Sequence, residues 1–147
     1  MDKNKVYLTQ TDTTVGFLSL DDKKLANIKN RPTTQKTLRV VDSFKTLKTH
    51  TRIPKQHRKL VRNSKNTTFI YPNGESFRVV DKDSNHHKFI EKFGTMYSTS
   101  ANNSGESFNL DFARENCDIE VLSNQSYSET TSSSIVKISN QKLVKIR

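Results

Sequence analysis

The chain of 147 residues contains one cysteine, four glycines and no tryptophan, and it has no long hydrophobic run. Its only cysteine, Cys117, cannot form an internal disulfide or a thiolate cluster for a metal. No window approaches the roughly 20 apolar residues of a membrane-spanning helix. The charged N-terminus, MDKNKVYLTQ, lacks the apolar run of a signal peptide. These absences predict a cytoplasmic protein with reduced thiols and no membrane partner.

The common phosphate-binding signatures are also missing. The sequence has neither GxxxxGK followed by Ser or Thr nor GxGxxG, and four glycines leave little backbone that could cradle phosphates. A phosphate site would therefore need side chains. The adjacent His86 and His87 cannot both face one ion from a regular element. We therefore predict no metal site there and expect both histidines to be solvated at the surface.

Positive charge is in excess, because 25 Lys and Arg residues against 15 Asp and Glu give a formal net charge of +10. When clustered cations bind nucleic acid they release its condensed counterions, which makes binding favourable. This charge balance therefore favours a polyanionic partner. Lysine and asparagine are both abundant, however. An A-rich genome would give the same composition to a protein that does not bind RNA. The charge marks an RNA-binding face only if it clusters on the surface.

The apolar residues lie in short blocks, which predicts a folded chain rather than a disordered one. We predict one domain, residues 1–147, because no linker or internal repeat divides the sequence. Alternation and turn signals predict strands at residues 5–10, 38–41, 67–71, 76–80, 96–98, 119–122, 135–138 and 143–146. Apolar spacing and cap or stop residues predict helices at residues 42–47, 54–61, 88–93 and 111–116, and a serine- and threonine-rich loop covers residues 123–134.

The region after the first strand predicts a turn and a further helix. The turn, residues 11–14, ends at Gly16, and a helix capped by Asp21 or Asp22 follows. Pro32 should end that helix because it disfavours the α conformation of the residue before it. Strands alternate with helices, and a hairpin signal at residues 72–75 adds antiparallel pairing. The predicted fold is therefore α/β, with a mixed parallel and antiparallel sheet flanked by helices.

Three local features could carry chemistry, and each has a plainer explanation. Residues 98–105, STSANNSG, run from a strand into small hydroxyl and amide side chains that could hold a ligand or form an ordinary polar turn. In residues 29–32, KNRP, the cations could share one face and clamp a phosphate chain, or simply end a helix. The turn TDTT at residues 11–14 could bind a ligand through hydroxyls or form a tight Asx-type turn.

Together these features resemble one family, the YrdC-like threonylcarbamoyl-AMP synthases. That family has a TDTxxG-type turn after the first strand, a KxRP segment after the first helix, and an STSANxSG loop, and all three occur here in the same order. The resemblance extends through Arg78, Ser133 and Arg147 and so covers essentially the whole chain. It implies a twisted sheet with an open basic cavity.

The resemblance implies synthesis of threonylcarbamoyl-AMP from L-threonine, bicarbonate or CO₂, and ATP, with release of pyrophosphate, for threonylcarbamoyladenosine in tRNA. Lys29 and Arg31 would hold the triphosphate as the catalytic cations. The resemblance assigns the other ATP contacts to Thr68, Ser100, Asn102 and Arg147, and the threonine contacts to Thr11, Ser98 and Ser133. Magnesium would accompany ATP, and tRNA and threonylcarbamoyl-transferase proteins would be partners.

Departures from the family pattern keep two alternatives open. The proline-glycine-proline loop of the family is replaced here by residues 64–67, and the small polar or basic residue four positions after the motif arginine is Gln35, with Lys36 displaced by one. The missing loop favours a noncatalytic module of the same fold that binds tRNA or double-stranded RNA. Carbamoyl transfer to another acceptor is a third possibility, although hydrogenase-maturation relatives usually carry this domain in a much larger chain.

Overall fold

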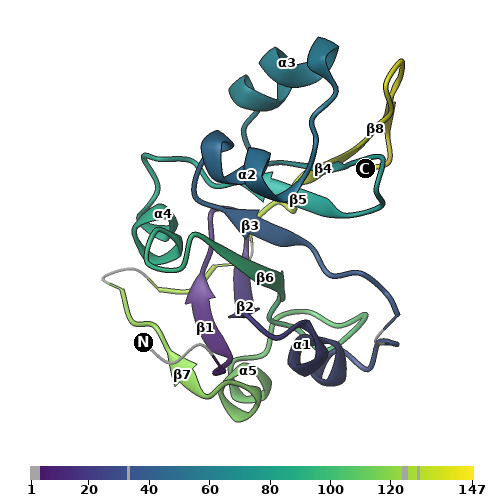
Figure 1. The fold of residues 1–147 in the computed structure, drawn as a ribbon. Coiled ribbons are helices and arrows are strands. Elements are labelled where there is room, and N and C mark those ends of the chain that lie inside the picture. The colour runs from purple at the N-terminus through teal and green to yellow at the C-terminus, as the bar shows by residue number, and fades with distance from the viewer. Residues whose placement is uncertain (1–3, 33, 124–125, 129) are drawn as a thin grey trace.

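The computed structural model describes residues 4–32, 34–123, 126–128 and 130–147. Within them the strands form one sheet in the order β7-β1-β2-β6-β3-β5-β4-β8-β9 (Figure 1). The strands are β1 (Tyr7–Gln10), β2 (Val15–Ser19), β3 (Arg39–Val41), β4 (Thr67–Ile70), β5 (Ser76–Val79), β6 (Thr95–Ser100), β7 (Ile119–Glu120), β8 (Ser134–Ile138) and β9 (Leu143–Lys145). The helices are α1 (Asp22–Ile28), α2 (Phe44–His50), α3 (Arg58–Asn63), α4 (Asn85–Ile90) and α5 (Leu110–Asn116), with a 3₁₀ turn, η1 (Lys55–His57).

The sheet is mixed, as the sequence predicts. β1 with β7, β3 with β5, and β4 with β8 are parallel pairs. The pairs β1 with β2, β2 with β6, β3 with β6, β4 with β5, and β8 with β9 are antiparallel. Helices flank this sheet, so the predicted fold class is confirmed.

Alternation along β4, β5 and β8 gives this half of the sheet two different faces. Phe69 and Phe77 lie opposite each other in the register and pack with Leu47 of α2 and Val61 of α3. The α2–α3 layer therefore covers one face of these strands. The intervening residues, among them Thr68 and Arg78, face the other way. That second face forms a wall of the cavity described below.

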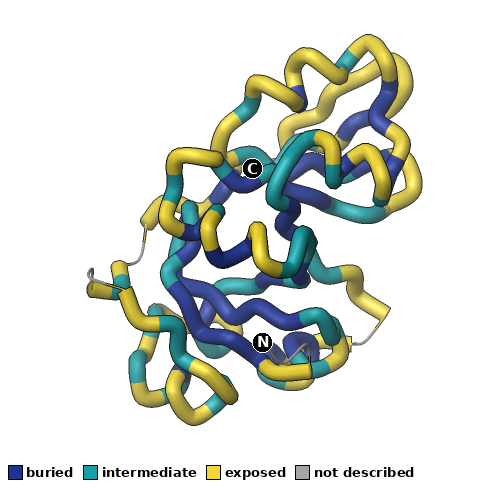
Figure 2. Tube along the Cα trace, turned by 60° about the vertical axis from the view of Figure 1, so that its left-hand side comes forward, coloured by how far each residue is buried: buried dark blue, intermediate teal, exposed yellow. Residues whose placement is uncertain are grey.

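The other half of the sheet is buried on both faces. Leu8 and Phe17 pack with Leu25 of α1 and Ala113 of α5. On the opposite face, Leu18 packs with Phe89 and other residues around α4. Figure 2 shows the buried residues in the interior of the chain trace and the exposed residues mostly at its periphery. The short β3 joins the two halves by pairing with both β5 and β6.

The segment after the first strand differs from the sequence prediction. Residues 15–19 form β2, which pairs antiparallel with β1, so the turn at residues 11–14 closes a hairpin. Gly16 lies inside β2 and does not end the turn. A Cβ added at Gly16 would lie 3.0 Å from both the Thr99 carbonyl oxygen and Thr11 Cγ2. Glycine is needed there because β6 and the turn approach the strand closely.

Helix α1 starts where the sequence predicts and ends earlier. Asp21 caps it by accepting a hydrogen bond of 3.0 Å from the Lys23 N–H. Asn30 then adopts a left-handed φ of 52°, and the Arg31 N–H donates to the Ala26 carbonyl at 2.9 Å. With the Asn30 N–H donating to the Asn27 carbonyl at 3.2 Å, this is a Schellman ending. The helix therefore ends before Pro32, and Pro32 is not the cause.

The remaining predicted elements are present with shifted bounds. The helices expected at residues 42–47 and 88–93 start at Phe44 and Asn85. The helix expected at residues 54–61 divides into η1 and α3, and the strand expected at 96–98 extends through Ser100. Within the predicted loop 123–134, residues 124, 125 and 129 lie outside the described part of the chain. Among the described helices, none is long and apolar enough to cross a membrane.

Candidate functional site

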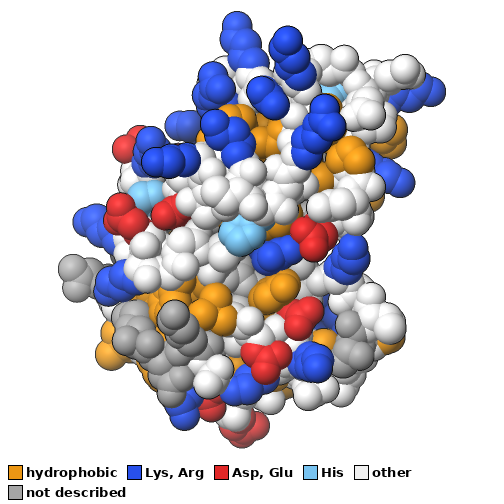
Figure 3. All heavy atoms as spheres, viewed as in Figure 1, with side chains coloured by type: hydrophobic (Ala, Val, Ile, Leu, Met, Phe, Trp, Pro, Cys, Tyr) orange, Lys and Arg blue, Asp and Glu red, His pale blue; other side chains and the backbone are white. Residues whose placement is uncertain are grey.

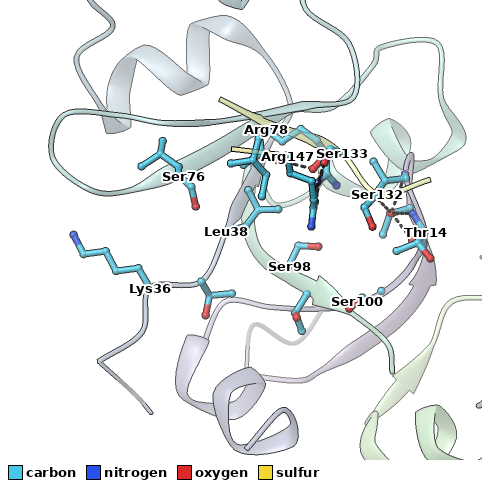
Figure 4. A pocket seen from close by; sticks show the side chains of 18 of the residues that line it. Thr14, Lys36, Leu38, Ser76, Arg78, Ser98, Ser100, Ser132, Ser133 and Arg147 are labelled. Atoms are coloured by element: carbon cyan, nitrogen blue, oxygen red, sulfur yellow. Dashed lines mark hydrogen bonds between the residues drawn. The ribbon is translucent and has the colours of Figure 1, made fainter. Parts of the chain in front are cut away.

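A cavity of about 280 Å³ lies on the sheet face opposite α2 and α3 (Figure 4). Its walls come from the β1–β2 turn, the chain after α1, the carboxyl end of β6, strands β4 and β5, and the last residue of the chain. In Figure 4, Ser98 and Ser100 lie across the cavity from Ser133 and Arg147. Segments that are far apart in the sequence therefore meet at one site.

The Thr11 hydroxyl organises the turn between β1 and β2. Its oxygen accepts hydrogen bonds of 3.1 Å from the Thr13 and Thr14 N–H groups, and it also donates to the Thr14 carbonyl. Thr11 is buried and lines the cavity. The hydroxyl therefore shapes a tight turn and presents that turn to the cavity.

An internal ion pair joins this turn to the central strand β5. Arg78 Nη2 donates to Asp12 Oδ1 at 3.0 Å, and the two side chains are 3% and 4% exposed. Such a pair holds its partners strongly in place because breaking it would leave a buried charge unpaired. Arg78 Nε and Asp12 Oδ2 have no hydrogen-bond partner among the described residues. Arg78 lines the cavity, so Asp12 fixes one of its cationic walls.

His86 is buried, at 4% exposure, so the prediction of two solvated histidines is wrong for this residue. Both of its ring nitrogens lack a hydrogen-bond partner in the described structure. Burial lowers the pKa of His86 to about 4, with Asp12 acting against the shift and Arg78 adding to it. His87 is partly exposed, and its Nε2 lies 2.9 Å from the Asp42 carbonyl oxygen.

The C-terminal segment contributes a second arginine to the cavity. Arg147 Nε and Nη2 both donate to the Ser133 carbonyl, at 3.0 and 2.7 Å. The Ser133 hydroxyl lies 2.8 Å from the Thr68 hydroxyl of β4. β8 begins directly after Ser133 and is parallel to β4, which brings these three residues together. The resemblance assigns Thr68 and Arg147 to ATP and Ser133 to threonine, and the structure places the three in hydrogen-bond contact.

Lys29 takes a different position from Arg31. Its side chain is buried, and its ammonium donates to the backbone and side-chain oxygens of Ser100 and Asn102, at 2.6 to 3.3 Å. In return, the Ser104 hydroxyl donates to the Lys29 carbonyl at 2.7 Å. Burial, and secondarily the charge of Arg31, lower the pKa of Lys29 to about 8. Lys29 therefore ties the end of α1 to the loop after β6.

Seven of the nine predicted site residues line the cavity: Thr11, Arg31, Thr68, Ser98, Ser100, Ser133 and Arg147. Lys29 and Asn102 do not. Asn102 lines a neighbouring hollow on the other side of Ser100, and its amide nitrogen donates to the Glu106 carbonyl at 2.7 Å. Most of the predicted residues therefore lie on the cavity wall, whereas Lys29 and Asn102 support the adjoining loop.

Some residues that line the cavity were not among the predicted site residues. Arg78 was recognised in the resemblance but given no role, although an arginine inside an apolar strand is itself a signal of a special partner. Lys36 also lines the cavity, and its ammonium donates to the Asn73 carbonyl at 3.2 Å. Thr13, which lies within the TDTT turn, and Ser76 of β5 are further lining residues that the sequence prediction did not name as site residues.

The charge of the wall has one sign. Arg31, Lys36, Arg78 and Arg147 line it, and its described lining includes no aspartate or glutamate. Threonine and serine side chains provide most of the remaining polar groups. Cations together with short hydroxyl side chains suit an anionic ligand that has several oxygen atoms.

The fold and the site together define an α/β protein whose mixed sheet, flanked by helices, carries a cation-lined cavity on one face. The chain belongs to the Sua5/YciO/YrdC family, because the model of that family, described as "Telomere recombination", matches residues 1–147. This confirms the family resemblance inferred from the three sequence features. A comparison with curated proteins gives no match.

Solved structures of low sequence identity share the fold. Sua5 of P. abyssi in complex with L-threonine is 17% identical with a TM-score of 0.75, and the match covers 97% of this chain and 50% of that one. E. coli YciO is 16% identical with a TM-score of 0.76, covering 99% and 83%. Full-length HypF, in a phosphate- and nucleotide-bound form, is 16% identical with a TM-score of 0.70, covering 97% and 26%. This chain spans about half the length of the Sua5 structures.

Proposed function

We propose that this protein makes threonylcarbamoyl-AMP from L-threonine, bicarbonate or CO₂, and ATP, for threonylcarbamoyladenosine in tRNA. The observation that carries the proposal is the cavity itself. It brings Arg31, Arg78 and Arg147 together with the hydroxyl-rich Thr11 turn and the Ser98–Ser100 end of β6. Membership of the family and the fold shared with threonine-bound Sua5 support the same assignment.

The reaction needs a protected position more than it needs a strong base. The neutral amine of threonine adds to CO₂ and loses one proton to water, which gives a carbamate that decomposes readily in water. A carbamate oxygen then attacks the α-phosphorus of ATP. The new O–P bond forms as the bond to pyrophosphate breaks, and pyrophosphate leaves with the electron pair. Positioning and neutralisation of the charge on the leaving group account for most catalysis of this kind.

We propose that Arg31 neutralises the negative charge on the leaving pyrophosphate, because it is exposed at the cavity wall and can offer two parallel N–H donors. Lys36 would assist from the same side. Thr68, Ser100 and Arg147 would contact the nucleotide. Lys29 and Asn102 would act indirectly, because their hydrogen bonds set the path of the loop after β6.

We assign the amino-acid end of the cavity to Thr11, Ser98 and Ser133. Arg78, held by Asp12, adds a fixed positive charge that suits a carboxylate or carbamate. The volume of about 280 Å³ lies just below the range of roughly 300 to 1,000 Å³ that is typical of ligand pockets. The threonylcarbamate and the reacting phosphates would fill the cavity, and the adenosine would extend along its open edge.

Magnesium would enter with ATP. The described lining of the cavity offers no carboxylate, and the side chain of Asp12 is already paired with Arg78. Mg²⁺ commonly keeps several waters and binds through substrate phosphates, which fits a wall of this composition. The triphosphate would therefore hold the ion, and the protein would hold the triphosphate.

The direct test is pyrophosphate release by the purified protein, with mass spectrometry to detect the adenylate. We expect release that requires ATP, L-threonine and bicarbonate together. Equal release without threonine would exclude this reaction. Release that needs ATP but not threonine, with a carbamoyl group found on another acceptor, would instead favour carbamoyl transfer.

A further inference from the structure

The surface formed by α2, η1 and α3 is the most one-sided in charge along the chain. Residues 43–74 contain eight Lys and Arg residues and no Asp or Glu. The cations are Lys45, Lys48, Arg52, Lys55, Arg58, Lys59, Arg62 and Lys65, and all eight are exposed. Figure 3 shows blue side chains gathered over the part of the surface where α2 and α3 lie. We call this set of eight the basic face.

The basic face is separate from the cavity. Its helices cover the sheet face on which Phe69 and Phe77 lie, and the cavity is on the opposite face, with Thr68 and Arg78. None of the eight cations lines the cavity. A ligand of the cavity therefore does not neutralise them.

Little within the protein compensates this charge. Among the described residues, Lys65 is the only member of the basic face with a carboxylate in ion-pair range, Asp81 at 3.6 Å. Lys48 and Arg62 lie over the ring of Phe44, with 5.5 and 4.9 Å to its centroid. Such contacts orient a cation but do not neutralise its charge. Crowded like charges repel each other in the folded protein, so their clustering favours an external polyanion.

The basic face also has hollows that can receive phosphate groups. One, of about 520 Å³, is lined by Lys48, Arg52 and Arg58 together with His50 and neighbouring threonines. A second, of about 500 Å³, is lined by Arg52 and Lys55 beside Asn73 and Asn140. Arg52 belongs to both, so the hollows adjoin. Cations spaced along adjoining hollows match a chain of phosphates better than a single small anion.

The small amount of exposed apolar surface on the basic face indicates which kind of polyanion it binds. Leu60 is the only large hydrophobic residue that is exposed within the described residues 43–65. Protein interfaces need apolar or aromatic anchors, and stable attachment to a membrane surface needs an apolar helix face. Neither is present. Moreover, α2 and α3 have seven and six residues, and both pack against the sheet, so neither projects into a groove to read bases.

We propose that the basic face binds RNA through its phosphate backbone, independently of the cavity. The choice of RNA over DNA rests on the proposed function, because that function concerns tRNA. Binding through phosphates predicts low sequence preference and strong salt dependence. The same protein would then hold RNA on one side of the sheet while the small-molecule chemistry occurs on the other.

The test compares two triple variants that lose the same charge. Lys48→Gln/Arg52→Gln/Lys55→Gln removes cations from the hollows. Lys23→Gln/Lys88→Gln/Lys92→Gln removes three exposed lysines on or next to α1 and α4. Binding of fluorescently labelled tRNA is measured by anisotropy over a range of salt, without ATP or threonine. The plot of log affinity against log salt has a negative slope. We expect this slope to become less steep by about 2 to 3 for the first triple and to change little for the second.

Equal losses in the two triples would overturn the proposal, because they would show that only net charge matters. Loss of tRNA binding in Arg31→Ala with no loss in the first triple would also overturn it, since RNA would then occupy the cavity. Vesicles containing phosphatidylserine and duplex DNA are the competitor arms, and tighter binding to either than to tRNA would contradict the choice of RNA. The assay contains no substrates, so its outcome is independent of whether the adenylate is made.

Discussion

Arg31 is the residue whose loss should separate chemistry from folding most clearly. It is exposed, it lines the cavity, and its backbone N–H belongs to the ending of α1 while its side chain stays free of the core. Arg31→Ala should therefore change the free energy of unfolding by no more than about 0.5 kcal/mol. Threonine-dependent pyrophosphate release should fall by roughly 100-fold or more, because a lost guanidinium leaves the leaving group uncompensated.

Arg52→Ala is the matched control for Arg31→Ala, since it removes an exposed arginine outside the cavity. It should keep full synthetic activity. Normal turnover by Arg31→Ala would contradict the assignment of Arg31 to the triphosphate. Lys29→Ala is not an equivalent control, because Lys29 is buried and its loss would strand the oxygens of Ser100 and Asn102.

His86 should make stability depend on pH in the acid range. Its pKa in the folded protein is lowered by burial to about 4, against 6.5 for a free side chain. As pH falls below 6.5 the unfolded chain takes up this proton before the folded one. Stability is therefore lost between pH 6.5 and 4, by up to about 1.4 kcal/mol per pH unit for one proton. Denaturant unfolding at pH 7, 6 and 5 measures this loss.

His86→Leu should remove that contribution. The variant deletes the two unpartnered ring nitrogens and keeps an apolar group beside Phe89. Its free energy of unfolding should fall less between pH 7 and 5 than that of the parent protein. Parallel curves for the two proteins would show that other groups cause the acid loss. Asp12, Arg78 and His87 are the charged neighbours that act on His86, and all three stay in place.

At the scale of single elements, the end of α1 determines where Arg31 lies. The Schellman ending needs a left-handed residue at position 30, and Asn30 supplies it with φ of 52°. Asn30→Gly should be neutral or stabilising by up to about 1 kcal/mol, because glycine adopts this conformation without steric cost. Asn30→Val should be destabilising by about 1 to 2 kcal/mol, because a β-branched residue disfavours positive φ.

Chemical denaturation and the pyrophosphate assay together test this element. Asn30→Gly should keep activity, and Asn30→Val should lose activity because the chain leaves α1 in a different direction. Equal stability of the valine and glycine variants would show that the left-handed conformation at residue 30 is unimportant. Both substitutions are on an exposed residue, so loss of core packing does not complicate the comparison.

The same elements show what the sequence can and cannot reveal. The N-cap of α1 and the hairpin at residues 72–75 are local features. The sequence limited the cap to Asp21 or Asp22, of which the structure has Asp21, and it predicted the hairpin correctly. β2 was missed because the predicted turn was extended to Gly16 and no element was assigned to residues 17–19, whereas pairing with β1 and β6 makes residues 15–19 a strand. The Arg78–Asp12 pair was missed for the same reason, since its partners are 66 residues apart. Local chemistry was readable, and contacts between distant segments were not.

At the scale of the whole molecule, the cavity is formed by two halves of the sheet. Thr11, Ser98 and Ser100 belong to the half with β1, β2 and β6, whereas Thr68, Arg78 and Ser133 belong to or adjoin the half with β4, β5 and β8. Between them lies β3, which has three residues. A ligand that touches both halves therefore adds contacts across this short connecting strand.

Ligand binding should accordingly raise the melting temperature. A ligand at 100 times its dissociation constant adds about 2.7 kcal/mol to the free energy of unfolding. For a domain of this size each kcal/mol raises the melting temperature by about 2 to 4 °C, so a shift of about 5 to 10 °C is expected. A non-hydrolysable ATP analogue and L-threonine should each give a shift. The two together should give more than either, because they contact each other within one cavity.

Stereochemistry and one variant provide the controls for this thermal shift. D-threonine should give little stabilisation, because Thr11, Ser98 and Ser133 lie in fixed positions around the proposed amino-acid end. Arg31→Ala should lose most of the shift with the ATP analogue and keep the shift with L-threonine, because Arg31 lies on the side assigned to the triphosphate. A full ATP shift in Arg31→Ala would place the nucleotide elsewhere. Equal shifts with L- and D-threonine would mean that the cavity does not recognise threonine, and the proposed reaction would then lack its first substrate.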